Sequence, residues 1–323
     1  MPVNRIRSYF RLLVNAGKEF AADNVVKLSA SLAYYTVFSI GPLFLVIISL
    51  VGLFFDERRV TSNIRYQISN MLGPEGAQGI MNIIEKMQAQ TDPARFSIIG
   101  LVILVFGATT IFADIQDSIN YIWSIRAKPK KGWLKFLKNR LLSFSMVAGI
   151  GFLLLVSLLL NTLMDLLMDY LRQLFVQEVL TGIRIVGNLV LYAVISSLFA
   201  VIYKVLPDAQ IRWKDAFVGA TFTGLLFLFG KFLIGFYLAS SDPASTYGAA
   251  ASVIIILSWV YYSSIILYFG AEFTKVYALT FGSGITPNET AVFIIKQEAK
   301  ELPERAQVKS KDLLHGIDPD EPE

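Results

Sequence analysis

The chain contains no cysteine, a single histidine and few charged residues. The absence of cysteine excludes disulfides, thiolate metal sites and cysteine nucleophiles. Charged residues make up 17% of the 323 residues and hydrophobic residues 54%, whereas roughly a quarter of the residues in a soluble domain are charged. The first residues also lack the compact apolar core of a cleavable signal peptide. The composition therefore favours the lipid bilayer as the main solvent, with the first membrane span directing insertion.

Long apolar runs recur along the chain, and each is long enough to cross a hydrocarbon core of roughly 30 Å as a helix. They are too long and too uniformly apolar for the strands of a membrane barrel. We therefore predict an all-α integral membrane protein with six transmembrane helices. The predicted spans are residues 28–55, 96–122, 140–165, 183–206, 214–240 and 247–278.

Residues 1–27 are predicted to form a cytoplasmic amphipathic helix. Apolar side chains recur there at helical spacing, while basic side chains lie largely elsewhere on the helix. The apolar set is Val3, Ile6, Phe10, Leu13, Gly17 and Phe20, and the basic set is Arg5, Arg7, Arg11 and Lys18. Two interpretations stay open: the helix lies on the membrane surface, or it packs on the cytoplasmic face of the protein itself.

The distribution of lysine and arginine predicts the orientation, because cytoplasmic segments near span ends hold the excess. The link between spans two and three, SIRAKPKKGWLKFLKNR, has seven basic residues and no acid. The first outer link has five basic residues balanced by five acids, and the fifth link, SSDPAS, has no basic residue. Both termini are therefore expected to face the cytoplasm.

Two further segments flank the predicted spans. Residues 56–95 form a long outer link in which the apolar period is broken at Gly73-Pro74-Glu75-Gly76 and then resumes, so we predict a helical hairpin as a periplasmic insertion. Residues 281–323 are assigned to a cytoplasmic tail that is largely disordered, because the segment from Glu298 onward is polar, contains proline and is rich in both charges.

Ionisable residues inside membrane spans are costly and usually face the bundle interior or a wet cavity. Three predicted spans contain them. In the sixth span, side chains spaced by three or four form one polar stripe. This stripe consists of Tyr261, Ser264, Tyr268, Glu272 and Lys275. The second span carries Asp114 and Asp117 on a similar stripe, and the fifth carries Lys231.

The predicted topology places these residues at different depths, at about 1.5 Å per residue. The two aspartates of span two and the Glu272 and Lys275 side chains are expected in the cytoplasmic third. They either anchor the span ends near the headgroups or belong to a substrate or proton path. Their position at the foot of the stripe weakens the case for a buried ion pair. Lys231 lies nearer the outer side with no evident partner, so it either snorkels to the headgroups or meets an anionic substrate group.

The first span has its own polar face, in which Ser31, Tyr35 and Ser39 follow at spacings of four and Gly41-Pro42 comes after them. Proline removes a helical donor and clashes with the preceding turn, so a kink is expected at Pro42. A kinked helix with a polar face often lines a cavity. Proline kinks are also common in spans with a purely structural role, and both interpretations stay open.

The basic link at residues 128–140 interleaves aromatic residues with lysines, as a nucleic-acid patch can. Its position directly between two spans favours anionic lipid headgroups instead. The predicted partners are therefore membrane lipids, with no nucleic acid, and a homo-oligomer is left open.

Two segments resemble a known family. The sequences SASLAYYTVFSIGPLFLVI in span one and SDPASTYGAAASVIIILSWVYYSSIILYFGAEFTKVYA in span six are similar to signature segments of the YihY/BrkB family of bacterial inner-membrane proteins. The resemblance extends over roughly residues 5 to 280. It implies a six-helix protein of the bacterial inner membrane with a helical outer insertion. It implies less about activity, because members carry an old ribonuclease label, a virulence or serum-resistance label, or a link to lipid export.

A ribonuclease activity is not expected from this sequence. RNA hydrolysis usually needs a metal cluster or a histidine pair, and the only histidine, His315, lies in the predicted tail. We therefore expect no enzyme, no cofactor and no metal site. An intramembrane enzyme using Asp114, Asp117 and Glu272 is disfavoured because no nucleophile accompanies them.

The favoured function is an envelope-related transporter or flippase-like protein for a lipid or another anionic amphiphile. Its basis is the polar first span, the stripes on spans two and six, and the isolated Lys231. The alternative is a membrane scaffold or assembly factor for envelope proteins, acting through the outer insertion.

Overall fold

The computed structural model describes residues 2–52, 56–90, 98–128, 177–240, 250–289 and 291–296, together with the single residues 145, 149 and 247. The chain divides into a unit Met1–Phe293, which contains every helix and strand of the described residues, and a second unit Ile294–Glu323. The predicted third span at 140–165 and most of the basic link at 128–140 lie outside the described residues.

Long helices dominate the described residues. In chain order they are α1 Pro2–Ala22, α2 Val25–Gly52, α3 Glu57–Gln90, α4 Ile98–Ile122, α6 Gln177–Val205, α7 Trp213–Ser240 and α9 Ala251–Thr280. Among the described residues, three stretches are long and apolar enough to cross a membrane: Val25–Ile48, Trp213–Tyr237 and Ala251–Thr280. They coincide with predicted spans one, five and six.

Helices α4 and α6 coincide with predicted spans two and four. Within α6 the apolar part, Leu189–Val205, is shorter than a full membrane crossing. The structure therefore supports a helical membrane protein, and the number six for its spans stays a prediction.

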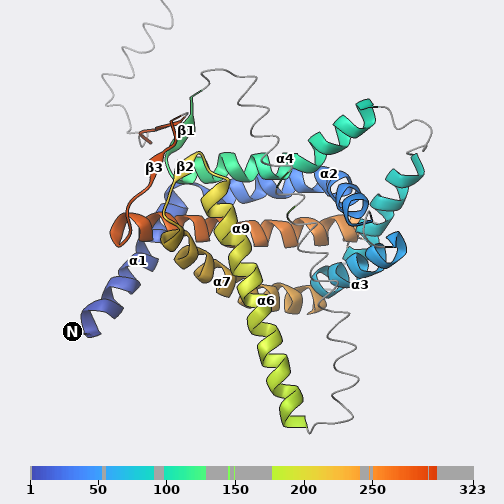
Figure 1. Ribbon diagram of the computed structural model, residues 1–323, viewed down its shortest axis with the longest axis horizontal. Helices are drawn as coiled ribbons and strands as arrows, with labels where there is room; N and C mark the ends of the chain where they lie inside the picture. Colours follow the sequence, from blue (N-terminus) through green and yellow to red (C-terminus); the bar gives the residue numbers. More distant parts are fainter. Residues whose placement is uncertain are drawn as a thin grey trace, which may run out of the picture. The chain divides into compact units, whose positions relative to one another are not determined.

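Helix α9 lies at the centre of the first unit, where it packs against α1, α2, α3, α4 and α7. Figure 1 shows α2 (blue) and α4 (green) side by side with α9 (orange) running along them. Helices α6 and α7 form a second closely packed pair, and α7 joins that pair to α9. The polar stripe predicted on span six therefore belongs to the helix with the most neighbours, where a polar side chain is most easily enclosed.

Small residues allow α7 and α9 to approach closely. A Cβ atom added to Gly219 of α7 would clash with the Thr274 side chain of α9, and one added to Gly270 of α9 would clash with Thr223 of α7 and Tyr203 of α6. The Tyr203 hydroxyl lies 3.0 Å from Thr223 Oγ1 and donates to the Leu267 carbonyl at 2.8 Å. The contact is therefore tight and its polar groups are satisfied.

Helix α3 is the predicted outer insertion, and it consists of two helical halves. Gly73 separates them with a non-helical backbone (φ 75°, ψ 173°), next to Pro74. Glycine reaches this positive φ without the steric cost that a side chain adds. The Arg65 guanidinium of the first half donates to Gln78 Oε1 of the second at 2.6 Å. The break predicted at Gly73-Pro74 is confirmed.

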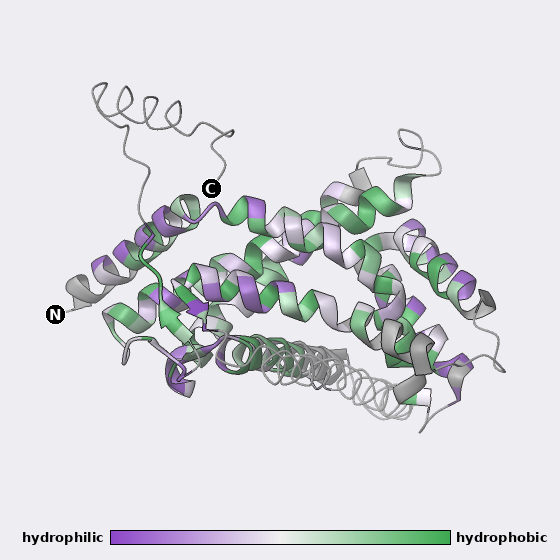
Figure 2. Ribbon diagram, turned by 90° about the horizontal axis from the view of Figure 1, so that it is seen from above, coloured by the Kyte–Doolittle hydropathy of each residue, from purple (hydrophilic) through white to green (hydrophobic). Residues whose placement is uncertain are grey.

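Helix α1 packs on the protein itself over its second half. Leu12 and Ala16 are buried against Phe273 and Val276 of α9. The helix ends where Asn24 adopts a left-handed conformation (φ 51°), a common helix terminus. Figure 2 shows hydrophilic and hydrophobic turns alternating along α1, beside the label N. One face of this helix therefore packs on the protein itself, which is one of the two interpretations. Phe10, on another face, remains 66% exposed.

Four short strands were not predicted from the sequence. Strand β1 (Ile125–Ala127) pairs antiparallel with β4 (Ala291–Phe293), and β2 (Ala209–Gln210) pairs antiparallel with β3 (Thr286–Pro287). The segment after α9 thus reaches back to the ends of α4 and α6. The predicted start of the tail at residue 281 is too early, because residues up to Phe293 belong to the folded unit.

Polar side chains hold this segment in place. Asp215, in the first turn of α7, accepts hydrogen bonds from the backbone N–H and the hydroxyl of Ser283, both at 3.2 Å. Asn120 of α4 and Asp208 exchange two hydrogen bonds at 3.1 and 2.8 Å. The first contact ties α7 to the segment after α9. The second ties α4 to the link between α6 and α7, and the Asp208 carbonyl of that link accepts from the Asn288 backbone N–H at 3.0 Å.

Candidate functional site

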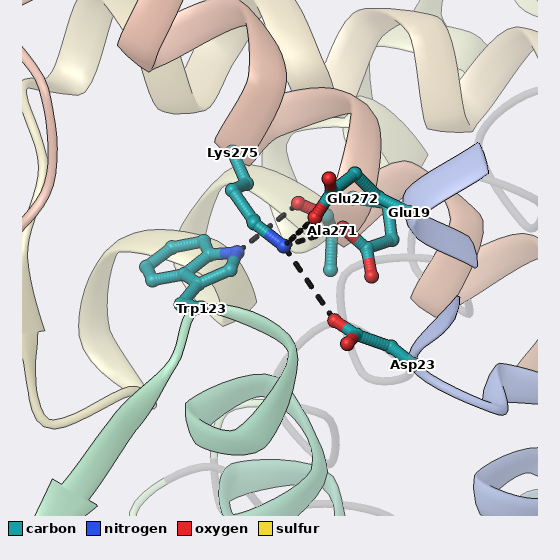
Figure 3. Close-up of polar contacts among 6 residues, drawn as sticks. All are labelled: Glu19, Asp23, Trp123, Ala271, Glu272 and Lys275. Carbon is teal, nitrogen blue, oxygen red and sulfur yellow. Dashed lines mark hydrogen bonds and ion pairs between the residues drawn. The ribbon is translucent and has the colours of Figure 1, made fainter. Parts of the chain in front are cut away.

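Lys275 of α9 lies among three carboxylates. Its Nζ atom is 2.8 Å from Glu19 Oε2, 3.5 Å from Asp23 Oδ2 and 3.2 Å from Glu272 Oε2. Figure 3 shows these contacts, with Glu19 and Asp23 approaching from α1 and its end and Glu272 from α9 itself. We refer to these four residues as the ion cluster.

The local sequence explains how the ion cluster forms. Glu272 and Lys275 are three residues apart on α9, so their side chains lie on the same face. Glu19 and Asp23 are four apart at the end of α1, where the turn at Asn24 follows. Because Leu12 and Ala16 dock that helix on α9, both acids lie beside Lys275.

The ion cluster is largely enclosed. Glu272 has no exposed surface, Asp23 is 4% exposed and Lys275 is 8% exposed, whereas the Glu19 side chain is 48% exposed. Three carboxylates therefore face one ammonium group, and charges removed from water need close partners. One carboxylate oxygen, Glu272 Oε1, has no hydrogen-bond partner among the described residues.

The expectation from sequence that a buried ion pair is disfavoured is wrong, because Glu272 and Lys275 form one. Two members of the ion cluster, Glu19 and Asp23, were not predicted to lie beside span six. The sequence feature that could have identified Glu19 and Asp23 is their spacing of four residues at the end of a helix predicted to lie on the cytoplasmic side.

Three carboxylates could in principle hold a metal ion. One oxygen from each of Glu19, Asp23 and Glu272 lies within 4.8 Å of the others. However, Lys275 Nζ already contacts an oxygen of each of the three residues. The lysine thus provides the positive charge that a metal ion would otherwise supply.

A second polar group lies next to the ion cluster, between α2, α4 and α9. The Ser31 hydroxyl of α2 donates to Asp114 Oδ1 of α4 at 3.3 Å, while Asp114 Oδ2 is buried without a partner among the described residues. Tyr268 of α9 is fully buried and faces Ser118 and both aspartates of α4. Within the described part of the chain its hydroxyl has no partner in good hydrogen-bond geometry, although Ser118 lies beside it. Asp117 is exposed.

The structure thus brings together the lower part of the span-six stripe and the acids of span two. Tyr268 connects the two groups, because it is one helical turn from Glu272 and faces α4. The upper part of the stripe is less distinctive. Ser264 is buried and donates to the Val260 carbonyl of its own helix at 2.6 Å, and Tyr261 is half-buried.

The candidates on the first span do not form one site. Ser39 is 3% exposed, while Tyr35 is 42% exposed and pairs edge-to-face with Tyr34. Helix α2 continues through Pro42, and Pro42 is close to Gly107 of α4. Ser31, from the same polar face, is the residue of this helix that contacts Asp114.

Lys231 of α7 lies away from the ion cluster, beside a surface hollow of about 420 Å³. The described residues that line the hollow are Leu228, Lys231, Phe232, Gly235 and Phe236. Phe232 and Phe236 are 70% and 68% exposed. Within the described part of the chain, no ion pair or hydrogen bond involves the Lys231 ammonium group.

Trp123 is a further residue that sequence reasoning missed. It is buried at the end of α4, and its indole N–H donates to the Ala271 carbonyl of α9 at 3.1 Å. Ala271 directly precedes Glu272, so this bond fixes α4 against the turn of α9 that carries the ion cluster (Figure 3).

Comparison with known proteins gives one family. The model for "Virulence factor BrkB" matches residues 16–292. A UPF0761 membrane protein of Tolumonas auensis is 32% identical over 263 residues, which cover 78% of this chain and 80% of that protein. A UPF0761 membrane protein of Pseudomonas aeruginosa strain LESB58 is 27% identical over 255 residues.

The relatives differ in length from this chain. The match to the Pseudomonas protein covers 78% of this chain but 59% of that protein. No solved structure matches the chain significantly. The family match extends from α1 to β4, so it includes the ion cluster, Asp114 and Lys231. The chain therefore belongs to the BrkB family of membrane proteins.

Proposed function

We propose that this protein transports a lipid or another anionic amphiphile across the membrane. The observation that supports this function best is the hollow beside Lys231. Its volume of about 420 Å³ lies within the range of roughly 300–1,000 Å³ that is usual for small-molecule sites. Its described lining contains one cation among apolar and aromatic residues.

This lining fits the two parts of an amphiphile. An anionic headgroup would pair with the Lys231 ammonium group, and an acyl chain would lie on Phe232 and Phe236. Lys231 is 18 residues into α7, so it lies about 27 Å along the helix. Lysine at such a position is costly unless it meets water, a headgroup or a bound anion.

The proposal includes the finer topology predicted from the sequence. Six spans with both termini in the cytoplasm would place Lys231 toward the outer side of the inner membrane and the ion cluster toward the inner side. A substrate would then meet a cation on one side and an acidic group on the other. No enzymatic step is proposed.

The alternative of an envelope assembly factor acts through residues 56–95. The apolar side chains of α3, among them Ile64, Ile80 and Ile84, are buried in the protein's own core. Its exposed face is mainly polar, with Tyr66 at 65% exposure as the main exception. This alternative has less support than transport for that reason.

Purified protein in liposomes tests the transport function. A fluorescent phosphatidylglycerol in the inner leaflet is expected to reach the outer leaflet, where a membrane-impermeant reductant quenches it. Lys231→Ala should slow this movement about tenfold, because a hydrogen bond to a charged group contributes roughly 1.5–3 kcal/mol. Lys231→Arg should retain the rate.

Lys214→Ala provides a matched control, because Lys214 is exposed at the start of the same helix. Its rate should equal that of the unmodified protein. Absence of phosphatidylglycerol movement with folded protein contradicts the proposed function. Equal rates for a zwitterionic lipid contradict the role of Lys231.

A further inference from the structure

Buried polar atoms without partners are concentrated in one place. Four such side-chain atoms occur among the described residues: Asp114 Oδ2, the Tyr268 hydroxyl, Glu272 Oε1 and Ser196 Oγ. The first three belong to the polar groups described above, and the fourth lies on α6. A buried polar group without a hydrogen bond destabilises the folded protein, so three together call for an explanation.

The three atoms follow one another through the protein. Tyr268 and Glu272 are four residues apart and lie on the same face of α9. Asp114 and Asp117 face Tyr268 from α4. Ser31 of α2 already occupies the other oxygen of Asp114. Asp114, Tyr268 and Glu272 therefore form a row that crosses from α4 to α9.

The row continues to the protein surface through the ion cluster. Glu272 contacts Lys275, which contacts Asp23 and Glu19 of α1. Asp23 is buried, but the Glu19 side chain is 48% exposed. The titratable groups facing the row are thus Asp114 and Asp117 of α4, Tyr268, Glu272 and Lys275 of α9, and Glu19 and Asp23 from α1 and its end.

Water between these groups would satisfy the unpartnered atoms, because buried waters typically bridge two to four polar groups. Carboxyl groups, a phenol and water in sequence are chemically able to pass a proton. The row contains more carboxylates than ammonium groups. A positively charged species such as a proton is therefore favoured there. Lys275 Nζ contacts all three carboxylate residues of the cluster, which leaves less room for a metal ion than for a proton.

We propose that Glu19, Asp23, Glu272, Tyr268 and Asp114 form a proton path from the cytoplasmic end of α9 into the helix bundle. A proton accepted by Glu272 leaves Asp23 or Glu19, and the Tyr268 hydroxyl accepts one proton as it donates its own toward Asp114. The path itself rests on the row of polar atoms. Coupling of proton movement to lipid transport rests in addition on the proposed function.

Proton flux in liposomes tests the path. Full-length protein is reconstituted in vesicles that contain a pH-sensitive dye, and a potassium diffusion potential drives protons inward. Glu272→Gln should slow acidification on the order of 100-fold, near the lower end of what a positioned proton-transfer group contributes. Tyr268→Phe should slow it about tenfold, because water would replace the hydroxyl in part.

Tyr268→Phe is the sharper variant because it removes one hydroxyl and keeps the aromatic ring that packs in the core. Ser196→Ala is its matched control, since it removes the other unpartnered buried hydroxyl, which lies outside the row. Unchanged flux in Ser196→Ala together with slowed flux in Tyr268→Phe supports the path. Equal flux in all variants, or none above empty vesicles, overturns it.

Phosphatidylglycerol movement is measured in the same vesicles with and without a pH gradient. Lipid movement without proton flux overturns the path and leaves the proposed function standing. Proton flux without lipid movement supports the path and contradicts the proposed function. Lipid movement accelerated by the gradient in the unmodified protein, but not in Glu272→Gln, supports the coupling. Lipid movement at the same rate with and without the gradient overturns the coupling.

Discussion

Lys275 and Lys231 are both lysines within apolar helices, but their surroundings differ. Lys275 is 8% exposed and contacts three carboxylates, whereas Lys231 lies in an apolar hollow on α7. Helix α9 encloses its charges among neighbouring helices, while α7 turns one face to α9 and leaves Phe229, Phe232 and Phe236 exposed. The comparison teaches that Lys275 is used in contacts within the protein, whereas Lys231 lies on a surface that the proposed function assigns to the substrate.

The largest effect is expected from removing Lys275. Lys275→Ala leaves Glu272 and Asp23 buried without their cation, and breaking a buried pair in this way costs about 3–5 kcal/mol. The melting temperature in detergent, followed by size-exclusion fluorescence, should fall markedly. Lys231→Ala should change it little, since it removes no described contact. Equal melting temperatures for the two variants would contradict the difference described between the two lysines.

The two faces of α7 can be compared with matched glycine substitutions. Gly219→Ala places a methyl group against Thr274 of α9 and should destabilise the protein by about 1–3 kcal/mol. Gly235→Ala meets no atom within 4 Å, and alanine favours a helix over glycine by roughly 0.5–1 kcal/mol. Thermal stability should therefore fall in the first variant and stay equal or rise in the second. Destabilisation by Gly235→Ala would indicate that the face beside Lys231 is packed.

The smallest effect should come from the exposed edge of the ion cluster. Glu19→Gln removes a pair whose acid is 48% exposed, and exposed ion pairs contribute about 0–1 kcal/mol. Asp23→Asn changes a buried acid and should lower the melting temperature more. The reverse order would mean that Glu19, not Asp23, holds α1 on α9.

Helix positions could be predicted because long apolar runs dictate them. Spans one, two, four, five and six coincide with helices to within a few residues, and the break at Gly73 followed from glycine and proline. The strand pairs could not be predicted, because β2 and β3 have two residues each and β1 and β4 three. Such lengths are too short for an alternating pattern to appear.

The ion cluster shows where sequence reasoning about sites reaches its limit. Glu272 and Lys275 were identified because they interrupt an apolar run. Glu19 and Asp23 lie in an ordinary polar segment, and they are 256 and 252 residues from Lys275. Their spacing of four places them on one face of a helix, but it does not identify Lys275 as their partner, because that contact forms only when α1 docks on α9.

The same separation imposes an order on biogenesis. A ribosome synthesises α1 long before α9, so Glu19 and Asp23 are made 256 and 252 residues before the lysine that pairs with them. Docking of α1 through Lys275 is consequently among the last steps of assembly. A chain interrupted before α9 would carry Glu19 and Asp23 at its first helix without the lysine that pairs with both of them.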